Sequence, residues 1–333
     1  MVKTDNNFII GECNTLLDIK SLIDLIKIDK ELKWIVNKIN FSKELKFYNL
    51  KNNISYSSVF FVLEQIFIGL KKEYPILYNS EFTKGKEEIF INDIIWLYEW
   101  KKYNEKIFIE KIHSKIKNGF SCIKIKINKE LLYLQYNFLK KIKNIYPFLK
   151  IRIDANGCFK NKFEALYFIN KFYELDIICL FEQPILPGNW NDISYICKNS
   201  ESPIALDEEL IGIVKLKEKR KLLDFINPEY IVIRPSICGG FNGSEEWIKE
   251  AYKRNIRWYV SSSLESNIGI NAIVQWTFIM NKKYSLGNKI YHGLNTTCIY
   301  INELNTSPFV KGKVGFTWNN KFLYKEKNLI TCG

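Results

Sequence analysis

The sequence predicts an α/β fold in which strands and helices alternate and the strands close into a barrel. From residue 89 to residue 295, short runs rich in Ile and Val alternate with amphipathic stretches of helical length. A charged residue ends each of five successive apolar runs, at intervals of 25 to 28 residues. These residues are Lys126, Asp154, Glu182, Asp207 and Arg234. Such an interval fits one strand, one helix and two turns, and seven or eight such units predict a closed parallel barrel.

The two ends of the chain lack this alternation. The first part predicts a short strand over 7–13 and helices over 20–39 and 57–74. The last part predicts strands joined by a turn, which we expect to return to the N-terminal part. We therefore expect a smaller domain made from both chain ends and a barrel between them. In chain order, the three parts are 1–88, 89–295 and 296–333.

The elements of the barrel region follow from composition and period. Its apolar runs carry no polar alternation, as in parallel strands that helices cover on the outside. Strands are expected at 89–96, 122–127, 149–153, 177–181, 203–206, 230–233 and 257–261. Helices are expected at 104–118, 129–145, 162–174, 190–198, 214–223, 244–254 and 268–280. Because the charged residues stand at the carboxyl ends of the strands, we expect them to meet at one mouth of the barrel.

Composition argues against several other classes of protein. The net charge is +13, but the lysines are spread along the whole chain, so we expect a solvated surface and no nucleic-acid partner. Two histidines and eight scattered cysteines argue against a zinc site and indicate free thiols in a reducing compartment. The longest apolar stretch, 59–70, is too short to span a bilayer and contains Glu64. With no signal peptide evident at the start, we expect a cytoplasmic protein without a membrane partner.

Three of the five charged residues are carboxylates on consecutive strands. Asp154, Glu182 and Asp207 would repel one another if they met without a cation, and each would raise the pKa of the others. A hard divalent cation relieves that repulsion, and oxygen-only ligands suit Mg²⁺, or Mn²⁺ in its place. We therefore interpret these residues as metal ligands.

The lysines of the run Cys122–Ile127 supply the second part of the chemistry. Side chains alternate along a strand, so Lys124 and Lys126 share one face. A neighbouring ammonium and a nearby metal both lower the pKa of a lysine, which makes it a usable general base. A metal that binds a carboxylate, beside a lysine base, predicts proton abstraction next to that carboxylate. The expected substrate is a small carboxylate.

Six short motifs, in order and at this spacing, resemble the o-succinylbenzoate synthases of menaquinone biosynthesis. These enzymes belong to the muconate-lactonizing-enzyme-like subgroup of the enolase superfamily. The motifs are KIK (124–126), DANG (154–157), FEQP (181–184), ALDEEL (205–210), RPSICGG (234–240) and SSSLESNIG (261–269). The resemblance implies a modified (β/α)₇β barrel of the TIM type, with an α+β capping domain built from the N- and C-terminal segments.

The resemblance also implies a reaction and a role for each matched residue. The reaction is the Mg²⁺-assisted syn dehydration of 2-succinyl-6-hydroxy-2,4-cyclohexadiene-1-carboxylate to o-succinylbenzoate, catalysed by a hydro-lyase. It implies that Lys126 is the base and then the acid, while Asp154, Glu182 and Asp207 bind the metal. Substrate binding falls to Lys124, Ser262 and Ser263, the two serines at the succinyl end. Asn156 and Glu208 would support the metal ligands from behind.

Two departures from the family pattern keep other functions open. Arg234 stands where the family usually has a lysine, and an arginine stays protonated, so it supplies fixed charge but cannot exchange a proton. The N-terminal segment before the GEC motif is also shorter, which bears on closure of the site. One alternative is a metal-binding barrel that no longer catalyses. The other is an N-acylamino acid racemase or dipeptide epimerase, which is less favoured because these enzymes need a second base and Arg234 cannot supply it.

Overall fold

A seven-stranded parallel sheet forms the centre of the protein, seen here in a computed structural model. The model describes residues 2–3, 8–15, 22–41, 50, 53–72, 74–285, 289–296, 309–311 and 315–318. Neighbouring strands follow one another in chain order across the sheet, from β4 to β10. The strands are β4 (Asp93–Ile95), β5 (Cys122–Lys126), β6 (Lys150–Asp154), β7 (Ile178–Glu182), β8 (Ile204–Leu206), β9 (Tyr230–Ile233) and β10 (Arg257–Val260).

A short extended segment closes this sheet into a ring. His292 pairs in parallel with Ile91 on one side, and Gly293 pairs in parallel with Ser261 on the other. The amide of Asn92 donates to the carbonyl of His292 at 2.9 Å, and the amide of Gly293 donates to that of Val260 at 2.8 Å. Because this segment follows the seventh helix of the barrel, the arrangement confirms the expected (β/α)₇β barrel.

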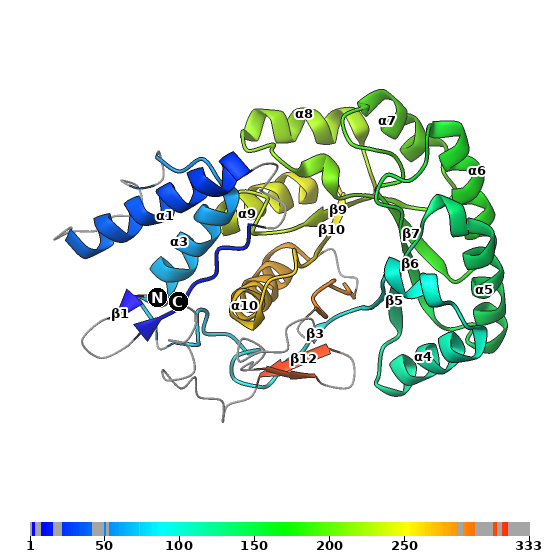
Figure 1. The fold of residues 1–333 in the computed structure, drawn as a ribbon, viewed down its shortest axis with the longest axis horizontal. Helices are drawn as coiled ribbons and strands as arrows, with labels where there is room; N and C mark the ends of the chain where they lie inside the picture. The colour runs from blue at the N-terminus through cyan, green and yellow to red at the C-terminus, as the bar shows by residue number, and fades with distance from the viewer. Residues whose placement is uncertain are drawn as a thin grey trace.

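Helices cover the outside of the sheet, as the apolar strands require (Figure 1). Figure 1 shows α4 to α8 following the curve of the sheet from β5 to β9. The barrel helices are α4 (Glu105–Lys117), α5 (Leu132–Ile145), α6 (Lys162–Tyr173), α7 (Trp190–Asn199), α8 (Leu216–Ile226), α9 (Gly240–Tyr252) and α10 (Asn267–Tyr284). No helix in the described ranges is long and apolar enough to cross a membrane.

The prediction of a single strand at 89–96 is wrong, because the chain forms two strands there. β3 (Ile89–Phe90) pairs antiparallel with β12 (Gly315–Trp318), whereas β4 pairs in parallel with β5. These two pairings belong to different sheets, so the chain turns between them, where Ile91 contacts the closing segment at His292. The apolar run is continuous in sequence and therefore gave no sign of the division.

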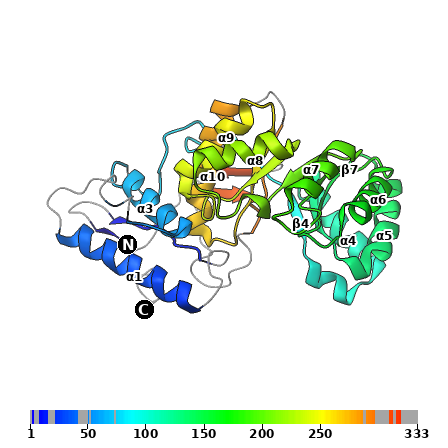
Figure 2. The same ribbon diagram turned by 90° about the horizontal axis from the view of Figure 1, so that it is seen from above.

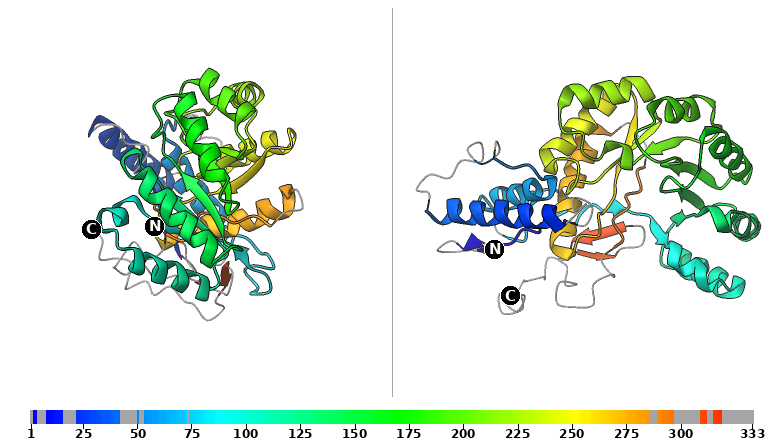
Figure 3. Two further views of the ribbon diagram at one scale, coloured as in Figure 1. Left: turned by 90° about the vertical axis from the view of Figure 1, so that its right-hand side faces the viewer. Right: turned by 45° about the horizontal axis from the view of Figure 1, so that its top comes forward.

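The ends of the chain form additional structure beside the barrel. Figures 2 and 3 show α1 (Leu22–Phe41) and α3 (Ser57–Gly69) on the side of α9 and α10, away from α4 to α6. β1 (Val2–Lys3) pairs with β2 (Phe8–Ile9). Near the other end, β11 (Phe309–Lys311) and β12 form one sheet with β3, so the C-terminal strands return to the start of the barrel range. The domain boundaries at 88 and 295 stay a prediction.

Helix α9 begins at Gly240, four residues before the predicted start, because a residue from α3 caps it. The buried carboxylate of Glu64 accepts hydrogen bonds from the amides of Phe241 and of Asn242, the latter at 3.1 Å. These amides have no partner within the helix, and a negative charge there is favourable. Gly240 has φ +71°, and a Cβ at this position would overlap Glu64, so glycine suits the site.

The segment that closes the barrel contains a buried, neutral histidine. The Nδ1 atom of His292 accepts a hydrogen bond from the amide of Val260 at 3.0 Å, and its Nε2 atom lies 3.0 Å from the Nδ2 atom of Asn281. Burial, together with the positive charge of Arg152, lowers the pKa of His292 to about 3. The neutral ring is therefore part of the closure of the barrel.

We expect His292 to make the protein sensitive to acid. In the unfolded chain His292 takes up a proton near pH 6.5, but in the folded chain it does so only near pH 3. The contribution of the neutral ring to the free energy of unfolding is therefore complete above about pH 6.5 and is lost as the pH falls toward 3. The loss is on the order of 5 kcal/mol. Urea unfolding at several pH values should show a flatter dependence for His292→Gln than for the unaltered protein. Equal slopes for the two proteins would contradict this assignment.

Candidate active site

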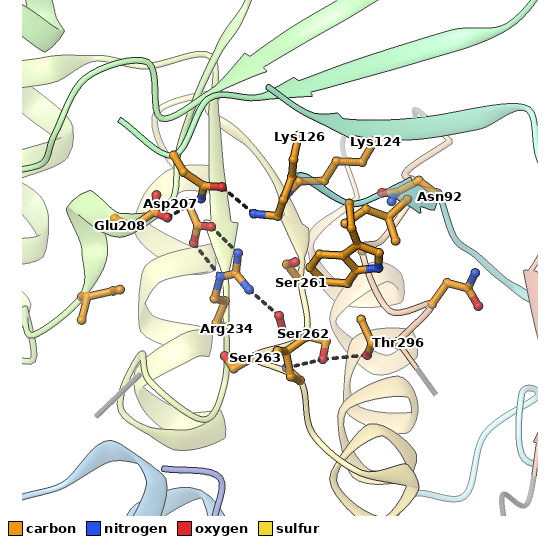
Figure 4. Close-up of a pocket in the computed structure, with 17 residues that line it drawn as sticks. Asn92, Lys124, Lys126, Asp207, Glu208, Arg234, Ser261, Ser262, Ser263 and Thr296 are labelled. Carbon is orange, nitrogen blue, oxygen red and sulfur yellow. Dashed lines mark hydrogen bonds and ion pairs between the residues drawn. The ribbon is translucent and has the colours of Figure 1, made fainter. Parts of the chain in front are cut away.

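A cavity of about 180 Å³ opens at the carboxyl ends of the barrel strands (Figure 4). Eight of the ten predicted site residues line it. They are Lys124, Lys126, Asn156, Asp207, Glu208, Arg234, Ser262 and Ser263. The other two, Asp154 and Glu182, are fully buried and contact the cavity residues from behind.

The register of the strands explains why residues far apart in sequence meet here. Lys126, Asp154 and Glu182 occupy matched positions on β5, β6 and β7, where the strands are parallel and in line. Each is the last residue of its strand. Parallel strands in a barrel bring such terminal residues to one end, as the sequence predicted.

Lys124 lies between two buried carboxylates. Its Nζ is 2.8 Å from Oδ2 of Asp154 and 2.6 Å from Oε1 of Glu182. Burial by itself acts to lower the pKa of Lys124, but the two carboxylates outweigh it and raise this pKa. The same pairing, with help from Lys126, holds the pKa of Asp154 below its usual range despite burial. Lys124 is therefore a permanent cation inside the site.

Glu182 differs from Asp154 in its surroundings. Burial and the neighbouring charge of Asp154 raise the pKa of Glu182 to about 7, even though Lys124 opposes the shift. The hydroxyl of Tyr259 on β10 also donates a hydrogen bond to Oε2 of Glu182. The site thus contains one carboxylate whose pKa is lowered and one whose pKa is raised, and opposite shifts of this kind are typical of functional sites.

Lys126 is positioned by two oxygen atoms at the edge of the cavity. Its Nζ donates to Oδ2 of Asp154 at 2.9 Å and to Oδ1 of Asn156 at 2.6 Å. Asn156 in turn donates to Oε1 of Glu208 at 2.8 Å. The ring of Trp96 lies 5.9 Å from the lysine nitrogen. Of the two lysines, Lys126 is the more exposed, so it is the one a substrate can reach.

Arg234 is bound to the third carboxylate. Its Nε donates to Oδ1 of Asp207 at 2.7 Å, and its NH2 group pairs with Oδ2. The other terminal nitrogen donates to the carbonyl of Ser262 (Figure 4). Burial acts to lower the pKa of Arg234, but Asp207 outweighs it and raises this pKa, so the guanidinium stays charged. Both carboxylate oxygens of Asp207 therefore accept hydrogen bonds from Arg234.

The carboxylates at this site are chemically suited to a hard divalent cation, but in this arrangement each of them is paired with a cationic side chain. Asp154, Glu182 and Asp207 offer carboxylate oxygens, the ligands that Mg²⁺ prefers. The Oε2 atom of Glu208 is also buried without a hydrogen-bond partner. Lys124, Lys126 and Arg234 balance the three negative charges. Within the described part of the chain, no three His, Cys, Asp or Glu residues are grouped so that they could hold a metal.

The two predicted serines differ in what their hydroxyls contact. Ser262 donates to Oε2 of Glu265 at 2.8 Å and accepts the amide of Leu264 at 2.8 Å. The hydroxyl of Ser263 is buried and has no hydrogen-bond partner in the part of the chain that the structure describes. Leu264 has φ +67°, a strained conformation for a branched residue. Ser263 is thus the serine with a hydroxyl left to bind a ligand.

The N-terminal segment contacts this serine loop. Glu12, in the GEC motif, accepts the amides of Ser266 at 2.9 Å and Gly269 at 2.8 Å at the start of α10. The side-chain amide of Asn14 donates to the carbonyl of Ser263 at 3.0 Å. Glu12 and Asn14, which lie in and next to the GEC motif, therefore help to position the serine loop that lines the cavity.

Sequence reasoning missed several residues of the site. Tyr259, Gln183 and Glu265 support Glu182, Asp207 and the serine loop, respectively. The cavity lining adds Asn92, Ile94, Trp96, Ile211, Ser261, Leu264, Gly293, Asn295 and Thr296. One signal was present, because Asn92, Ile94 and Trp96 alternate and so share a face where β4 ends. The others reach the site through loops that have no periodic pattern.

Comparisons with known proteins point to one superfamily. No family model matches the chain. The chain is 35% identical over 240 residues to an o-succinylbenzoate synthase of Desulfotalea psychrophila, and 27% identical over 161 residues to an L-amino acid-D/L-Glu epimerase of Sulfurimonas denitrificans. It spans 61% of the length of the first relative and 46% of the second.

Solved structures show the same relationship. The crystal structure of MenC from Desulfotalea psychrophila matches with a TM-score of 0.72 and 29% identity, over 88% of this chain and 80% of that one. The L-Ala-D/L-Glu epimerase from Bacillus subtilis also matches with a TM-score of 0.72, over 92% of this chain and 83% of that one. Its identity of 17% shows only a shared fold.

Proposed function

We propose that this chain is a member of the enolase superfamily and catalyses the reaction of an o-succinylbenzoate synthase. The substrate would be 2-succinyl-6-hydroxy-2,4-cyclohexadiene-1-carboxylate, and loss of water would give o-succinylbenzoate. The observation that carries the proposal is the placement of Lys126. Its nitrogen is held by Asp154 and Asn156 at the edge of a cavity that also contains a fixed cation, Arg234.

Lys126 would perform both proton transfers of a syn dehydration. As the neutral amine it takes the proton from the carbon that bears the carboxylate. The electron pair of that C–H bond forms the new ring double bond as the neighbouring C–O bond breaks. The resulting ammonium gives its proton to the departing hydroxide, which leaves as water. One group on one face is enough, which is consistent with an arginine at 234.

The surrounding residues would bind and orient the substrate. Asp154, Glu182 and Asp207 would hold Mg²⁺, or Mn²⁺, which when bound supplies positive charge for the substrate carboxylate and its enediolate. Lys124 and Arg234 would add charge, and Ser263, with Ser262, would bind the succinyl end. Asn156 and Glu208 would support the site from the cavity lining, through the hydrogen bonds that join Lys126 to Asn156 and Asn156 to Glu208. The apolar Ile94, Trp96 and Ile211 provide a wall for the ring. We further propose the domain boundaries given above and a cytoplasmic location.

A turnover assay tests this proposal directly. The purified protein is incubated with the cyclohexadiene substrate and Mg²⁺, and o-succinylbenzoate is measured by liquid chromatography. Product above the rate of the uncatalysed reaction is expected. No product, in a preparation shown to be folded and to bind Mg²⁺, would favour a barrel that binds metal but no longer catalyses. The engagement of Asp207 by Arg234 is the feature that favours this alternative.

The epimerase relative suggests a second activity to test. Epimerisation needs a base on each face of the substrate, and a guanidinium that stays charged cannot be one of them. We therefore expect no inversion of a dipeptide or N-acylamino acid. Deuterium incorporation at the α-carbon of both enantiomers in heavy water would revive the epimerase function.

A further inference from the structure

A second, smaller cavity lies at the opposite end of the strands from the candidate active site. Its volume is about 50 Å³. It is lined by Arg152, Tyr230, Arg257, Trp258, Tyr284, Lys289 and Ile290. Tyr230 and Arg257 are the first residues of β9 and β10, which places the cavity at the amino ends of these strands. Three of its seven lining residues are cations.

The most unusual of these cations is Arg152, which is buried and has no carboxylate partner among the described residues. Its side chain lies in the barrel core and is 5% exposed. One terminal nitrogen donates to the carbonyl of Tyr291 at 2.6 Å and to Oδ1 of Asn92 at 3.2 Å, both uncharged. Among the described residues, its Nε atom has no hydrogen-bond partner. The side chain also forms a hydrogen bond with the thiol of Cys179, whose pKa the guanidinium helps to lower. Buried arginines are nearly always paired with a carboxylate, and no described carboxylate pairs with this one.

The other two cations are also without an acidic partner. The guanidinium of Arg257 lies 4.0 Å over the ring of Tyr230, and the nitrogen of Lys289 lies 3.9 Å over the ring of Phe90. In the described part of the chain, neither forms an ion pair. By contrast, most other buried or half-buried cations of the barrel are paired with carboxylates, among them Lys124, Arg234 and Arg254. Aromatic faces stabilise Arg257 and Lys289 but supply no net negative charge.

We propose that this cavity binds a small divalent oxyanion of the size and charge of inorganic phosphate. A cavity needs about 10–15 Å³ of such space to hold one water molecule, so this one has room for a group of several heavy atoms, such as a tetrahedral oxyanion. Three cations that have no carboxylate partner among the described residues would supply charge-assisted hydrogen bonds, and two of them are guanidinium groups, which suit phosphate oxygens. The site is independent of the proposed dehydration.

One side chain connects the anion site to the candidate active site. The guanidinium of Arg152 lies 4.1 Å over the ring of Tyr259, and the hydroxyl of that tyrosine donates to Glu182. An anion bound to Arg152 would therefore also restrain the ring of Tyr259, which supports Glu182, a proposed metal ligand. The two sites remain distinct, because no residue lines both cavities.

Calorimetric titration with inorganic phosphate tests the site on the full-length protein, without Mg²⁺ and in about 0.15 M NaCl, which screens weak surface binding. Three proteins are compared: the unaltered chain, Arg257→Gln/Lys289→Gln, and the matched control Lys140→Gln/Lys198→Gln. The control removes the same charge from two exposed lysines on α5 and α7. Lys289→Gln alone serves as a second variant, because its exposed side chain is not needed for folding.

We expect saturable binding of phosphate to the unaltered protein and to the control. Affinity should fall by about tenfold or more in the Arg257→Gln/Lys289→Gln protein, and by less in Lys289→Gln, because each removes a charge-assisted hydrogen bond. The proposal is overturned if the unaltered protein shows no saturable binding. It is equally overturned if the cavity variants bind as tightly as the control, since phosphate then binds elsewhere, including among the cations of the active site.

Discussion

Replacing Lys126 by alanine should lower kcat for the dehydration by about 10²- to 10⁴-fold, the usual contribution of a general acid–base group. Lys126 is the lysine at the edge of the cavity, while Lys124 is buried between Asp154 and Glu182. Lys124 also lines the cavity, but its ammonium is held between these two carboxylates, so we expect it not to take over proton transfer. Initial rates of o-succinylbenzoate formation at saturating substrate and Mg²⁺ would measure the loss.

Lys126→Arg separates proton transfer from charge. An arginine keeps the positive charge beside Asp154 but stays protonated near neutral pH, so it cannot act as the base. We expect this variant to keep the thermal stability of the unaltered protein and to be as inactive as Lys126→Ala. Lys140→Ala, on the exposed face of α5, is the control for loss of a lysine. If Lys126→Arg keeps substantial activity, Lys126 acts only as a counter-ion.

Lys124→Met should lower the free energy of unfolding of the metal-free protein by about 3 kcal/mol. The side chain of Lys124 is 5% exposed and contacts two carboxylates that are 0% exposed. Without the ammonium, Asp154 and Glu182 remain buried with less compensating charge, although Lys126 and Arg234 stay nearby. Removal of one partner of a buried ion pair is costly because the other stays buried and uncompensated. Urea unfolding at pH 7.5, with a metal chelator present, would measure the change.

Addition of Mg²⁺ should restore more stability to Lys124→Met than to the unaltered protein. A divalent cation bound by the same carboxylates would replace the missing charge, and binding to the folded state alone stabilises it by mass action. Lys140→Met, which removes an exposed lysine on α5, should change the free energy of unfolding by no more than about 0.5 kcal/mol. If the two variants respond equally to Mg²⁺, the metal does not bind at Asp154 and Glu182.

The barrel and most of the candidate site could be predicted because their signals are local. Each charged residue follows its own apolar run, and the interval between them is that of a strand and a helix. The expected strand at 230–233 matches β9, and the other barrel strands begin and end close to the predicted residues, except at 89–96. The alternation of Lys124 and Lys126 on β5 also follows from period two alone.

Two predictions were wrong, the start of α9 and the single strand at 89–96. Both features depend on residues that lie far away in the sequence. Glu64, far back in the chain on α3, caps α9, and β12, near the C-terminus, pairs with β3. A window of neighbouring residues contains neither partner. The same applies to Glu12, whose carboxylate binds the start of α10 from 254 residues away. Local pattern therefore predicts where elements form, but not which residues from elsewhere end or divide them.

The sequence by itself determined the order of the elements, the barrel, and the set of carboxylates and lysines at one mouth of it. Only the tertiary structure decided which charges pair: Lys124 with Asp154 and Glu182, and Arg234 with Asp207. Among the described residues, it also showed which serine keeps an unpaired hydroxyl and that Arg152 is buried without a carboxylate partner. The physical reason is that periodicity is set by the backbone of one element, whereas pairing and burial depend on the distances between side chains of different elements.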